Sequence, residues 1–141
     1  MAVYINGKGN ISHQKTWGEG LLLADPKDYS GSKLECIQPD YSQFVDVRQL
    51  RRMSRIIKMG VAAGMLALRE AAVTVPDGII TGTGYGCLED TGIFLTKMVE
   101  SSENALNPTP FIQSTHNTIG SQIALLLQCQ GYNQTYTQRA F

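Results

Sequence analysis

Residues 107–141 read NPTPFIQSTHNTIGSQIALLLQCQGYNQTYTQRAF, and this stretch decides how we interpret the rest of the chain. Two prolines open it and mark a turn. Residues 111–115 then mix apolar and polar side chains, which predicts a short extended segment. Asn117 is a good N-cap residue, and apolar residues recur after it at helical spacing as far as Gly131. The alternating, β-prone residues 132–137 predict a strand directly after this helix.

The upstream residues alternate between predicted strands and predicted helices. We expect a strand over Ala2–Asn6, an irregular insertion over residues 8–47, a helix over Arg48–Ala72, a strand over Asp77–Thr81 and a helix over Glu89–Glu103. Strands that alternate with helices predict an α/β fold in which helices pack against a mostly parallel sheet. A chain of 141 residues is expected to form a single domain with a buried core.

Composition narrows the classes of partner and compartment. Twelve basic and twelve acidic residues cancel, so there is no overall field that would recruit nucleic acid or an anionic membrane. The three cysteines have unrelated spacings and fit neither a disulfide framework nor a zinc site. No segment approaches the roughly 20 apolar residues of a membrane span. We therefore expect a cytoplasmic protein without a bound metal.

Several segments together resemble the β-ketoacyl synthases, the condensing enzymes of fatty-acid and polyketide synthesis. The segments are Val3–Gly9 (an opening strand and turn), Leu50–Ser54 (an arginine-rich helix start), Pro76–Cys87 (PDGIITGTGYGC), and the PTPF, HNT and YNQTY runs of the last stretch. They follow one another in the order of the family and span nearly the whole chain. The chain is most similar to the divergent N-terminal branch of ketoacyl-synthase-like proteins.

This resemblance carries a set of expectations about fold and partners. It implies that residues 1–141 form the N-terminal half of a thiolase-like fold whose C-terminal half is absent. The family performs acyl transfer and decarboxylative condensation on an acyl carrier protein, whose phosphopantetheine arm would be the only cofactor. The expected assembly is a homodimer or a heterodimer with a competent ketosynthase. Half of a layered fold leaves a face uncovered, so association is also expected on physical grounds.

Two departures from the family pattern argue against catalysis by this chain. Active members place a cysteine about nine residues after the glycine that precedes this strand, and counting from Gly131 gives Ala140. The family also takes two histidines, or a histidine and an asparagine, from its C-terminal half. We therefore expect this chain alone to be inactive. Three interpretations remain: a piece of a condensing enzyme, a non-catalytic partner that resembles a chain-length factor, or a small interaction protein.

The resemblance suggests residues that line an acyl tunnel or a subunit interface. These are Thr115, His116, Asn117, Tyr132, Tyr136 and Phe141. For His116 a capping or buried hydrogen-bonding role competes with chemistry, and we favour the former. The two tyrosines are four residues apart on a predicted strand and should share one face, where an interface role is favoured over ligand stacking.

Five cations crowd the start of the first predicted helix, where the helix dipole disfavours positive charge. They are Arg48, Arg51, Arg52, Arg55 and Lys58. One interpretation pairs them internally with Asp40, Asp46 or another carboxylate. The other makes them a docking surface for an anionic partner, and the resemblance implies that this partner is an acyl carrier protein.

The glycine-rich turn that ends at Cys87 raises two further hypotheses. A phosphate cradle is disfavoured because neither register gives GxGxxG and no lysine is present for a P-loop. Cys87 precedes a predicted helix, a position that can lower a thiol pKa, and one hypothesis pairs it with His116 for thiol chemistry. We favour the alternative, in which Cys87 is a small residue that closes the turn. Cys129 is interpreted as an inert core or interface residue.

Overall fold

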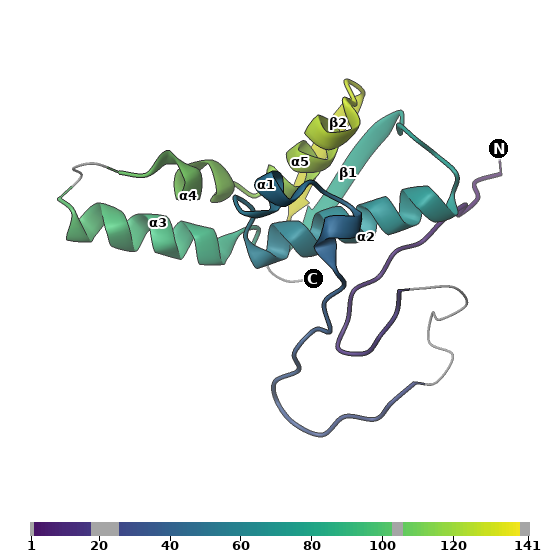
Figure 1. Cartoon of the computed structure of the whole chain (residues 1–141), viewed down its shortest axis with the longest axis horizontal. Coiled ribbons are helices and arrows are strands. Elements are labelled where there is room, and N and C mark those ends of the chain that lie inside the picture. Colours follow the sequence, from purple (N-terminus) through teal and green to yellow (C-terminus); the bar gives the residue numbers. More distant parts are fainter. Residues whose placement is uncertain (1, 18–25, 103–105, 139–141) are drawn as a thin grey trace.

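A computed structural model describes residues 2–17, 26–102 and 106–138 (Figure 1). Its elements are η1 (Tyr41–Gln43), α1 (Val47–Leu50), α2 (Arg55–Glu70), β1 (Gly78–Thr83), α3 (Leu88–Glu100), α4 (Pro108–Gln113), α5 (Thr118–Leu127) and β2 (Tyr132–Thr137). The predicted α/β class is confirmed, because helices pack on a sheet whose two strands are parallel. The described residues before η1 form neither helix nor strand.

The sheet pairs β1 with β2 in a register that runs from Gly78 opposite Tyr132 to Thr83 opposite Thr137. Helix α5 lies against one face of this sheet. At Gly120 an added Cβ would lie 2.8 Å from Thr81 Oγ1 and 2.9 Å from Asn133 Oδ1, so only glycine lets the helix approach this closely. The opposite face carries Ile80, which is 71% exposed.

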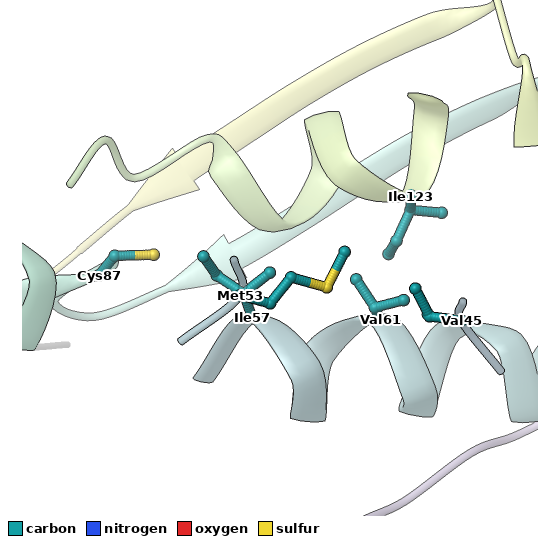
Figure 2. Close-up of a cluster of buried hydrophobic side chains, with 6 residues drawn as sticks. All are labelled: Val45, Met53, Ile57, Val61, Cys87 and Ile123. Carbon is teal, nitrogen blue, oxygen red and sulfur yellow. The ribbon is translucent and has the colours of Figure 1, made fainter. Parts of the chain in front are cut away.

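The core lies between α2 and α5 (Figure 2). Ile57 and Val61 of α2 are fully buried, and Ile123 of α5 packs against them. Two glycines of α2 leave room for the facing isoleucines of α5. An added Cβ would lie 2.6 Å from the side chain of Ile119 at Gly60 and 3.1 Å from that of Ile123 at Gly64. The small residues in the middle of α2 therefore set the distance between the two helices.

The single helix predicted over residues 48–72 is wrong, because the segment is divided. Helix α1 ends at Leu50, and α2 begins only after Ser54, whose backbone is extended with φ −68° and ψ 167°. Met53, which lies in this break, is buried in the core cluster. Met53 precedes the buried Ile57 by four residues and packs into the same cluster. The five cations consequently do not lie in the first turns of one helix.

Residues 111–115 are not extended as predicted. Helix α4 starts at Pro108, whose fixed φ suits the first helical position, and the Asn107 side chain accepts a hydrogen bond of 2.9 Å from the Thr109 amide. The prolines that signalled a turn thus begin a helix. The helix predicted to reach Gly131 ends earlier, because Gln128 adopts a left-handed conformation with φ 53° and closes it.

Residues 2–6 do not form the predicted strand and lie exposed. The chain then crosses the surface of α2, and we call this segment, Gly7–Gly9, the strap. Added Cβ atoms at these glycines would overlap the backbone oxygens of Ala67 and Ala63, and the Lys8 amide donates to the Glu70 carboxylate at 2.6 Å. Residues 7–9 thus pack on α2, and the residues before them do not pair with a strand. Residues 26–38, which belong to the irregular insertion, are exposed throughout.

The strap predicts a position-specific effect of alanine. Gly9→Ala places a methyl group against the Ala63 carbonyl and should lower the free energy of unfolding by about 1–3 kcal/mol through overpacking. Gly92→Ala in α3 meets no atom within 4 Å and should be neutral or stabilise the protein by up to about 1 kcal/mol through helix propensity. Urea unfolding of both variants checks this difference, and equal effects would contradict the docked strap.

Candidate functional site

An open groove of about 490 Å³ lies where the connection between α4 and α5 meets β2. Its lining residues are Tyr85, Ser114, Thr115, His116, Asn117, Asn133, Gln134 and Thr135. Each carries a hydrogen-bonding side chain, and none is an acid, a lysine or an arginine. The groove therefore suits a neutral polar surface or ligand better than a hydrocarbon or an ion.

The predicted Thr115, His116 and Asn117 are brought together in this groove by two local constraints. The turn after β1 presses against them, since Gly86 has φ +60° and an added Cβ would lie 2.9 Å from His116 Cα. The buried Thr118 lies beneath, and its hydroxyl is 2.9 Å from the Thr115 carbonyl oxygen. The backbone of the groove is therefore fixed, while the three predicted side chains are exposed.

The hydrogen bonds of these residues differ from the sequence-based expectation. Asn117 precedes α5 but has a helical backbone (φ −86°, ψ 0°), and its side chain makes no capping hydrogen bond. The ring of His116 has no hydrogen-bond partner among the residues that the structure describes. Both side chains therefore present unused hydrogen-bonding groups to the groove.

Tyr132 and Tyr136 share one face of β2, as their spacing predicts, but that face does not belong to the groove. Interaction with the Tyr136 hydroxyl raises the pKa of Tyr132. Tyr132 lies against Gly78 of β1, because a Cβ added at Gly78 would be 3.4 Å from the Cβ of Tyr132. The two rings thus cover part of the sheet face opposite α5, and each remains 59% exposed.

Sequence reasoning missed the groove residues outside the HNT run: Tyr85, Ser114, Asn133, Gln134 and Thr135. The alternation of β2 was visible, yet it does not reveal which segment lies beside the strand. The glycine turn that contains Tyr85 was also visible, but we weighed it only as a phosphate cradle, which we disfavoured, and as a tight turn closed by Cys87. Contacts between segments far apart in the sequence form this site.

The five predicted docking cations lie on and around the break between α1 and α2. Arg48, Arg51, Arg52 and Arg55 are exposed and Lys58 is half-buried. Within the described ranges none of them forms an ion pair. The carboxylates proposed as internal partners have other roles: Asp46 accepts from the Arg48 amide at 2.8 Å and caps α1, and Asp40 caps η1 through the Ser42 amide.

Cys87 lacks the environment of a nucleophile. It is 1% exposed, and burial, together with the nearby Asp90 carboxylate, raises its pKa to about 11. The expected effect of the helix start is thus outweighed by loss of solvent. Cys129 is half-buried, and its thiol lies 3.1 Å from the Pro76 carbonyl oxygen. Asp90 is itself buried, which its position in a charged run of sequence did not indicate.

Two predicted positions, Ala140 and Phe141, lie outside the described residues. Their assignment as the family's nucleophile position and as a tunnel residue stays a prediction. Among the residues described, no three His, Cys, Asp or Glu side chains are grouped in a way that could hold a metal ion. None of the described helices is long and apolar enough to cross a bilayer.

The raised pKa of Cys87 predicts a specific pH dependence. Because the thiol ionises less readily in the folded state, its contribution to stability is complete below the ordinary pKa of 9.0 and is lost as the pH rises toward about 11. The free energy of unfolding should fall by about 2 kcal/mol over that window. The loss should be smaller in Cys87→Ala, because that variant has no thiol to ionise at this position. The tyrosines titrate in both proteins, so their contribution cancels in the comparison, and identical pH profiles would contradict the burial of Cys87.

No protein-family model and no curated protein matches this chain. A solved structure described as the ishigamide ketosynthase/chain length factor is similar, with a TM-score of 0.58 at 19% sequence identity. The alignment covers 70% of this chain and 29% of that one. This chain therefore shares its α/β fold with part of that structure and spans less than a third of that neighbour's length.

Proposed function

We propose that this chain is part of a β-ketoacyl-[acyl-carrier-protein] synthase-like protein that acts in fatty-acid or polyketide-type chain building in the cytoplasm. The observation that carries the proposal is the fold shared with a ketosynthase/chain length factor over 70% of the chain. The family segments in the sequence also support it, since they occur in family order along the chain. The parent family performs acyl transfer followed by decarboxylative condensation.

A second candidate is a non-catalytic partner that resembles a chain-length factor. The environments of Cys87 and Cys129 favour it, because neither suits a nucleophile. A condensing enzyme requires a thiolate that accepts the acyl group. Cys87 is buried with a raised pKa, Cys129 lies against a carbonyl oxygen, and the counted nucleophile position is Ala140. In this role the chain would pair with a competent ketosynthase and shape the space in which the product grows.

The surface of α3 and α4 supports an assembly of this kind. The two helices lie side by side, away from the sheet, and Phe94 meets Phe111 with ring centroids 5.2 Å apart (Figure 1). The apolar side chains of Phe111 itself and of Val99 and Ile112 are between 56% and 76% exposed. A patch of this character indicates a covered surface in the working protein. We propose that a homodimeric or heterodimeric ketosynthase partner covers it.

The proposed role requires contact with an acyl carrier protein, which is acidic and carries the substrate on a phosphopantetheine arm. The unpaired cations around the α1–α2 break supply complementary charge. Because their charge is not neutralised by neighbouring carboxylates in the described residues, it is available to an anionic partner. No cofactor bound to this chain itself is required.

The non-catalytic candidate predicts that the chain does not accept an acyl group. We would incubate the Cys36→Ser variant with acetyl- and malonyl-loaded carrier protein and measure its intact mass, using this variant because Cys36 is the exposed thiol. The expected mass is unchanged, whereas a ketosynthase that retains its cysteine gains an acetyl group under the same conditions. A stable acyl adduct on this chain would instead establish the catalytic candidate.

Carrier docking predicts a charge-dependent and site-specific loss of affinity. Arg51→Glu/Arg52→Glu reverses two exposed cations and should weaken binding to a fluorescent holo-carrier by on the order of 10-fold at low salt. Lys27→Glu/Lys33→Glu makes the same change in net charge on the exposed insertion and should have little effect. Equal losses for the two pairs, or binding that salt does not weaken, would exclude this docking surface.

A further inference from the structure

Helix α3 carries an exposed row of apolar and small residues on one side, which we call the α3 seam. It consists of Leu88, Gly92, Leu95 and Val99, whose spacing of three or four residues keeps them on one side of the helix. Leu88, Leu95 and Val99 are 58%, 47% and 76% exposed. Helix α4 is the principal neighbour of α3 and meets a different side of it, through Phe94 (Figure 1). The α3 seam is therefore an apolar surface that no described helix or strand covers.

Gly92 makes a notch in the middle of the α3 seam. A Cβ added there would meet no atom within 4 Å, so no described residue fills the notch. Apolar residues at this spacing are the arrangement by which two helices pack side by side, with the side chains of one helix inserted between those of the other. A large apolar side chain of a second helix would fit over Gly92, between Leu88 and Leu95.

The charges around the α3 seam are acidic on one border. Glu89 and Glu100 are exposed, and each directly follows a seam residue, so both lie about 100° around the helix from the seam in the same direction. Lys97, the basic residue of this helix, comes two residues after Leu95 and lies on the opposite side. A helix that carries cations along the border of Glu89 and Glu100 would therefore complement this surface.

The same helix of a second copy complements the α3 seam poorly. Antiparallel pairing that places Leu95 of one copy over Gly92 of the other also sets Glu89 of each copy near Glu100 of the other. Like charges in such positions destabilise a helix pair. Parallel pairing would place Gly92 opposite Gly92 and leave the notch unfilled. Shape and charge are satisfied together only by a helix with a different sequence.

We propose that the α3 seam binds a helix of another protein, which places a large apolar side chain over Gly92 and carries lysine or arginine along the border of Glu89 and Glu100. The proposal goes beyond the proposed function, because it follows from the side chains of α3 and not from any reaction. The two also fail separately: acylation and carrier binding test the function, and the experiment below tests only this side of α3.

A charge-reversed copy of the full chain, Glu89→Lys/Glu100→Lys, is the probe for this surface. It keeps the α3 seam and supplies the cations that the proposed partner carries, so antiparallel pairing with the native chain joins an acid to a base at each border contact. We would label it at Cys36, the exposed thiol, and follow its fluorescence anisotropy as native chain is added. It should bind the native chain on the order of 10-fold more tightly than labelled native chain binds itself, and salt should reduce this difference.

Control variants separate the α3 seam from a general effect of charge. Leu95→Asp in the native chain should remove the gain, and so should Val99→Asp, because each puts a charge into the seam at an exposed position where the circular dichroism should not change. Asp28→Lys/Asp77→Lys makes the same change in net charge at exposed residues elsewhere and should bind the native chain no more tightly than the native chain binds itself.

Three results would overturn the proposal. The first is equal binding of the native chain by the two charge-reversed copies, and the second is a gain that survives both aspartate variants with unchanged circular dichroism. The third is a native chain that self-associates in sedimentation and becomes monomeric in Leu95→Asp, because a second copy would then occupy the α3 seam.

Discussion

The contact between α2 and α5 is the constraint on which the rest of the structure depends. Gly60 and Gly64 allow Ile119 and Ile123 to approach the α2 backbone, and the resulting cluster contains the fully buried residues of the core. Because α5 also lies on the sheet through Gly120, the same contact fixes where β1 and β2 lie. A small protein gains most of its stability from such apolar burial, so the helix pair holds the sheet in place.

The groove and the thiols give this fold a chemical character that differs from a reactive site. Neutral hydrogen-bonding side chains line the groove, and His116 meets no carboxylate that would activate it among the described residues. Burial suppresses ionisation of Cys87, which holds the turn after β1 in the core instead of serving as a nucleophile. Such a surface is better suited to recognition than to bond making, which is why we favour the non-catalytic candidate among the functions proposed above.

The exposed surfaces indicate that this architecture is completed by association. Parallel sheets are normally covered on both faces, yet the face opposite α5 leaves Ile80, Tyr132 and Tyr136 exposed. The free edge of β2 and the apolar side chains of α3 and α4 add further uncovered surface. Five of the twelve cations lie instead around the α1–α2 break, so the proposed assembly and the proposed carrier docking would use different parts of the molecule.

Sequence alone determined the elements whose signals are local. The periodicity of α2, α3 and α5 and the alternation of β2 were sufficient to predict those elements and the α/β class. Only the tertiary structure decided the rest. It interrupted the first predicted helix between Leu50 and Arg55, docked Gly7 and Gly9 on α2 where a strand was expected, and buried Cys87. These outcomes depend on which distant segment lies nearby, and local propensities of well under 1 kcal/mol per residue yield to the larger free energy of packing.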